Sequence, residues 1–325
     1  MKYLIAILCL AFCILPTLAA GEPTLADAYA QVSEYTNAVR AIETATAELE
    51  ALASDPDATV NGIVRAEEKR TEAIATRNTA EITAKQRVFN AASQLVTARA
   101  QAKISALRAR QANMQLQAAT VRNGLGTISA IELDKARETS LKADMAQQND
   151  ERTLADAETR VKPYGVVPAD GLPLPPSLDI ANYTVDNHLN IVTGKHRVNE
   201  AQRTLALADG FAVTAPLDRQ LKVRNLEDAR ATLKDLLRAQ RDTLSIAMTR
   251  YQAAVNELPR AAQAYQIAQE VTKAAQVRLD FGTISQVTML DSEIAQAEAK
   301  LALDNAKMEM WAATLNLQQA AGGAL

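Results

Sequence analysis

The sequence predicts an all-α protein built from two tandem repeats of long, antiparallel coiled-coil helical hairpins. The nine residues Val277–Ser285 (Val-Arg-Leu-Asp-Phe-Gly-Thr-Ile-Ser) match Val121–Ser129 (Val-Arg-Asn-Gly-Leu-Gly-Thr-Ile-Ser) at six positions. Each copy lies between two Ala-rich stretches, so a pair of helices has been duplicated. Aromatic residues make up 4% of the chain and hydrophobic residues 48%. This balance suits closely packed helices better than a thick globular core.

Residues 1–20 are predicted to be a secretory signal peptide. A short basic start precedes an apolar core, Tyr3–Leu15, that is too short to span a bilayer, and small residues precede position 21. The alternative is a retained membrane anchor. Both cysteines, Cys9 and Cys13, lie in this segment, and Phe12 argues against lipid attachment at Cys13. The exported chain should therefore contain no disulfide, thiol nucleophile or cysteine-ligated metal.

Charge and motifs argue against nucleic-acid binding and catalysis. The formal net charge is −3 and no block of like charge stands out, so nucleic acid is not an expected partner. No phosphate-binding loop, nucleophile elbow or His-Glu-x-x-His motif occurs in the sequence. The two histidines, His188 and His196, are too far apart on a helix to chelate one metal together. We therefore predict a protein without enzymatic activity, cofactor or metal site.

The first repeat is predicted to occupy residues 21–162. Pro- and Gly-poor stretches predict three helices in it, at residues 24–53, 63–123 and 129–162. The second would be about 90 Å long at about 1.5 Å per residue. Ser54–Asp57 breaks the first helix, and Gly124–Gly126 turns the chain between the other two. Ser129 and Glu132 are spaced as a capping box at the start of the third helix.

A Pro-rich linker at 163–177 should separate this repeat from the second repeat, residues 178–325. Five prolines and two glycines lie between Pro163 and Pro176. The second repeat follows the same plan, with helices predicted at residues 178–208, 217–279 and 285–320 and a turn at Gly282. Pro259 lies inside the long helix and should kink it.

Apolar residues recur at alternating steps of four and three within 104–121, 233–279 and 287–315. This heptad spacing predicts left-handed coiled-coil packing. Three aromatic residues on this seam are expected in the core: Tyr251, Tyr265 and Trp311. Three polar residues on it either set the register of the coil or face a water-filled lumen: Gln111, Gln240 and Asp304.

The segment Gly282–Ser292 (Gly-Thr-Ile-Ser-Gln-Val-Thr-Met-Leu-Asp-Ser) resembles the second periplasmic tip of the TolC family of outer-membrane efflux proteins. Tips of that family read Gly-Thr-x-Ser, followed by an apolar turn ending in Leu-Asp-Ala. The duplication and the Pro-rich bridge also match the family. The resemblance implies a homotrimer that forms a helical tunnel across the periplasm. It also implies that the tips meet a periplasmic adaptor of an efflux pump.

The chain departs from this family where strands of a membrane barrel would be expected. The connections at 54–62 and 209–216 are too short to supply two barrel strands with a turn, because each strand needs about 9–11 residues. Neither connection alternates apolar and polar residues. We therefore expect a TolC-like helical body without the barrel, associated with the membrane indirectly.

The residues of the family's aspartate constriction are only partly kept. Thr288 and Asp291 occupy the two constriction positions after the second tip, and Glu132 occupies the matching position after the first. Ile284 replaces a basic residue of the family pattern. Glu132 and Asp291 are therefore the candidates for a ring of acids in the lumen.

Eight tip residues are candidates for partner binding: Arg122, Gly126, Thr127, Ser129, Arg278, Gly282, Thr283 and Ser285. Simpler structural roles compete with this interpretation. The glycines permit a positive φ at a sharp reversal, the serines suit helix N-caps, and arginines are favoured in the last turn of a helix.

The function that these observations predict is an exported, oligomeric, TolC-like efflux conduit of the periplasm and outer membrane. The alternative is a non-transporting coiled-coil scaffold or spacer of the cell envelope. A conduit requires a continuous polar inner stripe along each hairpin, whereas a scaffold can bury that face. A third possibility, an adaptor-like hairpin protein, would require a lipoyl or β-rich region, which the sequence does not indicate.

Overall fold

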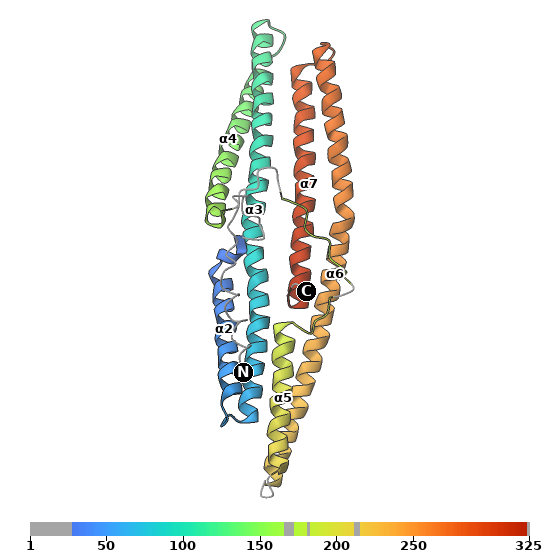
Figure 1. Ribbon diagram of the computed structural model, residues 1–325. Helices are drawn as coiled ribbons and strands as arrows, with labels where there is room; N and C mark the ends of the chain where they lie inside the picture. Colours follow the sequence, from blue (N-terminus) through green and yellow to red (C-terminus); the bar gives the residue numbers. More distant parts are fainter. Residues whose placement is uncertain (1–27, 166–171, 181–182, 211–214, 324–325) are drawn as a thin grey trace, which may run out of the picture.

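The computed structural model describes residues 28–165, 172–180, 183–210 and 215–323, which are largely helical (Figure 1). The elements are η1 (Tyr29–Gln31), α2 (Ser33–Ser54), α3 (Val60–Gly124), α4 (Ala130–Val161), η2 (Lys162–Tyr164), α5 (Leu189–Gly210), α6 (Pro216–Asp280) and α7 (Gln286–Ala321). None of the described residues forms a β-strand. The all-α prediction is confirmed, and the connection at 54–62 contains no strand. Residues 211–214 of the other connection lie outside the described part.

Two 65-residue helices, α3 and α6, form the axes of the two repeats. The shorter helices α2 and α4 pack along α3, whereas α5 and α7 pack along α6. Helix α7 also packs on α3, which joins the repeats. Both tips lie at one end of the molecule, and the α2–α3 connection, the end of α5 and the start of α6 lie at the opposite end (Figure 1).

The long helix α3 begins after a residue whose side chain can cap it. The Thr59 hydroxyl accepts a hydrogen bond from the Gly62 N–H at 3.1 Å and thereby caps the start of α3. The expected helices at 63–123 and 217–279 are confirmed with slightly longer bounds. Helix α6 continues through Pro259 without a break.

The core consists of small apolar clusters along the helices. Leu317 and Tyr251 belong to a cluster between α6 and α7, Phe89 and Leu315 to one between α3 and α7, and Leu95 to one between α3 and α4. A fourth cluster joins the start of the described chain to α3. Many members are alanines, as the composition predicts. Of the seam aromatics, Tyr251 is buried, whereas Tyr265 and Trp311 are only partly buried.

The first predicted helix, 24–53, is wrong at its start. The described chain forms a short 3-10 turn, η1, and α2 begins at Ser33 after an extended Val32. Contacts with α3 stabilise this turn, because the Lys85 ammonium lies 4.8 Å from the ring centroid of Tyr29. Tyr29 also makes an edge-to-face contact with Tyr35, with ring centroids 5.2 Å apart. Residues 24–27 lie outside the described part.

The predicted helix at 178–208 is also wrong at its start, because α5 begins at Leu189. The described residues between 172 and 188, here called the strap, cross the surface of α7 and α6 instead. The Leu178 N–H donates a hydrogen bond to the Tyr251 hydroxyl at 3.1 Å. Tyr183 and Val185, two positions apart, are both buried in the α6–α7 cluster. Such spacing fits an extended segment, in which alternate residues share a side.

Helix α5 starts at a histidine cap. The Asn190 N–H donates a hydrogen bond to Nδ1 of His188 at 3.3 Å. Burial lowers the pKa of His188, so its ring tends to remain neutral, as this acceptor role requires. Because the folded-state pKa of His188 is below the unfolded value, its contribution to stability is complete above the ordinary pKa of 6.5. The contribution is lost as the pH falls from 6.5 through the lowered folded-state pKa.

The exchange His188→Asn should therefore reduce the loss of stability on acidification while retaining an acceptor at the cap. Urea unfolding at pH 7.5 and at pH 5.5 measures this effect. The wild-type chain should lose more unfolding free energy between the two pH values than the variant does. His196→Gln removes the other histidine and serves as the control. An unchanged pH dependence in His188→Asn would show that His188 is not the titrating group.

Candidate functional site

The two tips have the same backbone geometry. At the first tip Gly126 has φ 73°, and its N–H bonds to the Asn123 carbonyl at 2.9 Å. The next N–H, of Thr127, bonds to the Arg122 carbonyl at 2.9 Å, which completes a Schellman motif. The second tip repeats the motif with Gly282 at φ 68°, bonding Gly282 to Leu279 and Thr283 to Arg278, each at 2.8 Å. The predicted turn role of both glycines is confirmed.

The hydroxyl residues of the tips complete these reversals. The Thr127 hydroxyl donates a second bond to the Arg122 carbonyl at 2.9 Å, and Thr283 does the same to Arg278 at 2.8 Å. The predicted capping box is present, because the Ser129 N–H donates to the Glu132 carboxylate at 2.8 Å. This bond lowers the pKa of Glu132. At the second tip, the Ser285 hydroxyl caps α7 by accepting the N–H of Thr288 at 3.1 Å.

Each tip also presents exposed apolar side chains that we did not select from the sequence. Val121 and Leu125 are exposed at the first tip, as are Val277 and Phe281 at the second, where Phe281 is 80% exposed. These residues occupy equivalent positions of the two repeats, next to the exposed Arg122 and Arg278. The repeat alignment itself was a signal for them, because both positions are apolar in both copies.

The two acids proposed for the constriction are not brought together within one chain. Glu132 lies on α4 and Asp291 on α7, and these helices flank α3 on different sides (Figure 1). The Glu132 carboxylate accepts the capping hydrogen bonds, whereas that of Asp291 accepts a hydrogen bond from Gln111 Nε2 of α3. Any ring formed by both acids therefore requires more than one copy of the chain.

Toward the tips, the helices form an open layer in the order α4, α3, α7, α6 (Figure 1). Helices α4 and α6 are its two edges. Leu141 and Met145 are exposed on α4, and Ile267 and Val271 are exposed on α6. Each pair is spaced four residues apart and so forms an apolar stripe on one side of its helix. We call these two pairs the α4 edge and the α6 edge.

A groove of about 510 Å³ runs along the joint between α3 and α4. An adjoining groove of about 430 Å³, which shares Gln101 with it, is lined by α3, α4 and α7. Five neutral polar residues of α3 line the first groove: Asn90, Ser93, Gln94, Thr97 and Gln101. Arg160 of α4 donates to the Gln94 amide oxygen at 3.1 Å. In the second groove, Arg108 is paired with Glu298 of α7 at 2.6 Å. One side of the first hairpin thus carries a polar stripe in which some charges are paired.

The polar seam residues all have protein partners. Gln240 Nε2 donates to the Ala320 carbonyl at 2.7 Å, and the buried Asp304 is paired with Lys300 at 2.7 Å. Gln111 bonds to Asp291, as described above. These contacts fit the register-setting interpretation of the three residues better than direct exposure to a lumen.

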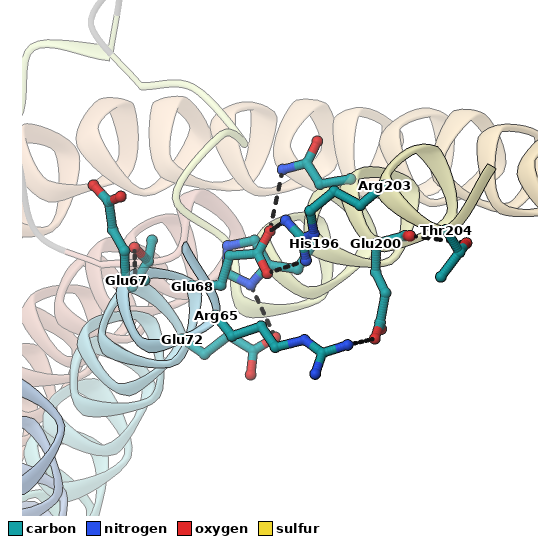
Figure 2. Close-up of polar contacts among 10 residues, drawn as sticks. Arg65, Glu67, Glu68, Glu72, His196, Glu200, Arg203 and Thr204 are labelled. Carbon is teal, nitrogen blue, oxygen red and sulfur yellow. Dashed lines mark hydrogen bonds and ion pairs between the residues drawn. The ribbon is translucent and has the colours of Figure 1, made fainter. Parts of the chain in front are cut away.

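Toward the opposite end, polar contacts join α3 to α5 (Figure 2). Arg203 donates two hydrogen bonds to the Glu68 carboxylate, at 2.8 and 2.7 Å, and His196 Nδ1 lies 3.1 Å from Glu72 Oε1. The Arg203 guanidinium lowers the pKa of Glu68. None of the four apolar clusters includes a residue of α5. We call this set of contacts the α3–α5 clasp.

His196 thus contacts a single carboxylate within the clasp. Among the described residues, no group of three or more histidine, cysteine or acidic side chains is arranged to hold a metal ion.

Solved structures with the same fold are outer-membrane channels. The Campylobacter jejuni CmeC outer membrane channel is 11% identical at a TM-score of 0.60, covering 92% of this chain and 85% of that one. The Vibrio cholerae outer membrane protein VceC is 13% identical at 0.60, covering 92% and 95%. CusC, whose structures concern transmembrane channel formation, is 13% identical at 0.60, covering 92% and 94%.

These similarities confirm the TolC-like fold predicted from the tips. No protein-family model matches the chain, and no curated protein sequence matches it.

Proposed function

We propose that this protein is exported to the cell envelope and assembles into an oligomeric TolC-like duct for efflux. The observation that carries this proposal is the open four-helix layer with an exposed apolar stripe on each edge. Neighbours of the same fold are channels rather than enzymes, which supports action through geometry rather than catalysis. The resemblance described above supports a trimer.

The two edges differ, so the expected contact between copies is heterologous. The α4 edge of one copy would pack on the α6 edge of the next, and each copy would retain one free edge until the ring closes. Burying both stripes in this way removes exposed apolar surface from water, which favours association. In such a ring, each copy would contribute Glu132 on α4 and Asp291 on α7 near its tips, and their proposed role in a constriction would then be possible.

The polar stripe along α3 and α4 supports a conduit at the first hairpin, which is one of the two hairpins that a conduit requires to be polar on the inside. A lumen must stay wet, and the neutral amides and hydroxyls of Gln94, Thr97 and Gln101 suit such a surface. The tips would face an adaptor partner through Arg122, Arg278 and their apolar neighbours, together with the Gly-Thr-Ile-Ser turns. The alternative scaffold function keeps the assembly but conducts no solute.

Charged residues on either edge should abolish assembly. We expect Leu141→Glu with Met145→Glu, or Ile267→Glu with Val271→Glu, to convert the oligomer to monomer at micromolar concentration. Light scattering after size exclusion measures this on the chain from residue 21 onward. The exchange Leu174→Glu, at an exposed apolar residue of the strap, is the matched control and should leave the oligomer intact.

Mixing the two double variants tests the heterologous geometry. Each variant retains one intact edge, so a mixture should form a heterodimer and nothing larger. A wild-type chain that remains monomeric, or edge variants that still form the full oligomer, would contradict the proposal. Drug sensitivity of a deletion strain separates the functions, because loss of an efflux conduit should raise the sensitivity whereas loss of a scaffold that conducts no solute should not.

A further inference from the structure

A small pocket lies where the strap meets the joint between α3 and α7, two helices that lie side by side (Figure 1). Its volume is about 200 Å³. Both helices and the strap line it, mainly through Lys85, Phe89, Pro176, Trp311, Leu315 and Gln318. These residues belong neither to the tips and edges nor to the α3–α5 clasp. The proposed duct therefore gives this pocket no role.

The walls of the pocket are aromatic and apolar. Phe89 and Leu315 are buried members of the cluster between α3 and α7. The rings of Phe89 and Trp311 have centroids 6.3 Å apart and planes inclined by 33°. The Trp311 indole N–H donates a hydrogen bond to the Pro173 carbonyl of the strap at 2.6 Å. Because its polar group is already satisfied, the indole ring can offer an apolar surface to a ligand.

A positive charge is left over on the Lys85 side of the pocket. Lys85 and Arg77 share one acid, Glu81, at 2.6 and 2.9 Å, so one carboxylate balances two cations. The bond to Glu81 uses one of the three donors of the Lys85 ammonium. The Lys85 side chain is only 23% exposed, which limits the screening of its charge by solvent. The nearby part of α7, residues 310–321, contains no charged residue.

The volume, the walls and the charge together indicate a class of ligand. Drug-sized molecules occupy pockets of about 300–1,000 Å³, so this pocket suits a smaller molecule. An apolar cavity of about 150 Å³ is large enough to bind benzene. We propose that the pocket binds a small aromatic carboxylate, with its ring against Phe89 and Trp311 and its carboxylate toward Lys85. This inference does not rest on the duct function, because one chain supplies the whole pocket.

Tryptophan fluorescence tests this proposal on the chain from residue 21 onward. Trp311 is the only tryptophan of the chain, so its emission reports directly on the pocket. We expect millimolar benzoate to change this emission in a saturable way, since a ligand of so few atoms binds weakly. Benzyl alcohol keeps the ring without the charge, and hexanoate keeps the carboxylate without the ring. Each of these two analogues should bind more weakly than benzoate does.

The exchange Lys85→Gln tests the charged side of the pocket. It should weaken benzoate binding about tenfold, because it removes a hydrogen bond between charged groups. It should leave the binding of benzyl alcohol unchanged. Lys69→Gln is the matched control, since Lys69 lies on the same helix and pairs with Glu48 of α2. This control should bind benzoate as the wild type does.

The exchange Gln318→Phe tests the pocket itself, because a larger side chain at this wall should fill it and abolish saturable binding. Circular dichroism of each variant checks that the helices form. A linear loss of emission that is equal in the wild type and in Gln318→Phe would indicate collisional quenching at the surface and overturn the proposal. Equal weakening by the two lysine variants would also overturn it. Neither result bears on the duct, whose own test is assembly measured by light scattering.

Discussion

Replacing Gly322 by alanine should destabilise the protein far more than the same change at Gly282. Both glycines have positive φ, 86° and 68°. A Cβ at position 322 would lie 2.3 Å from the His188 Cα and 2.4 Å from its backbone nitrogen. At position 282 a Cβ would meet nothing within 4 Å. The pair therefore separates backbone strain from steric overlap.

The strain alone should cost about 1–2 kcal/mol, the usual cost of the left-handed conformation for a residue with a Cβ. The overlap at position 322 involves backbone that cannot rotate away, so we expect a further loss of about 3 kcal/mol or more, at or above the upper part of the range for overpacking. Urea unfolding of both variants, followed by helical circular dichroism, measures the difference. Equal losses of unfolding free energy in the two variants would mean that the end of α7 is not in close contact with the backbone of His188, at the start of α5.

The tips could be predicted from the sequence because their geometry depends on neighbouring residues. Each reversal requires a glycine at positive φ, a hydroxyl residue after it and a serine cap, all within one nine-residue segment. The long helices could be predicted for the same reason, since heptads and the rarity of prolines and glycines act locally. Alignment of the repeats placed Gly126 and Gly282 in the same role.

The strap could not be predicted in the same way, because contacts distant in sequence determine it. Leu178 and Tyr183 pack on the cluster between α6 and α7 in place of continuing a helix, and the partner of the Leu178 N–H is Tyr251. Local signals were nevertheless present. Tyr183 and Val185 disfavour a helix relative to extended backbone, and Asp186 and Asn187 favour a turn before His188.

The candidate surfaces depend on which sides of the long helices stay uncovered. Heptad spacing identifies a seam but not the order of the helices. Leu141 and Ile267 lie on edge helices only because α3 and α7, rather than α4 and α6, join the two repeats. In the same way, the partner of Asp291 is Gln111 of the other repeat. Pairing between repeats is not encoded in either local sequence.

The α3–α5 clasp should contribute measurably to the free energy of unfolding. Most of that contribution should come from the ion pair between Glu68 and Arg203. The Arg203 and Glu68 side chains are only 21% and 16% exposed and make two hydrogen bonds. We expect Glu68→Gln and Arg203→Gln each to cost about 1–3 kcal/mol, the range for hydrogen bonds to charged groups. A double-mutant cycle should give a coupling free energy of at least about 1 kcal/mol, because the residues are in direct contact.

A neighbouring ion pair between α3 and α5 provides a matched control. Arg65 and Glu200 lie 3.4 Å apart with side chains 66% and 57% exposed. Their coupling should be near zero and at most about 0.5 kcal/mol, as for other exposed pairs. Similar coupling free energies in the Glu68–Arg203 and Arg65–Glu200 cycles would contradict the view that burial makes the Glu68–Arg203 pair more stabilising.

Acidification provides an independent measurement of the same pair. Arg203 holds the pKa of Glu68 below its ordinary value of 4.5. The stabilisation is therefore complete above that value and is lost as the pH falls toward the lowered pKa. In Glu68→Gln the unfolding free energy should fall less steeply below pH 4.5 than in the wild type. Because this pair joins α5 to α3, its loss should loosen the contact between the two repeats toward the end opposite the tips.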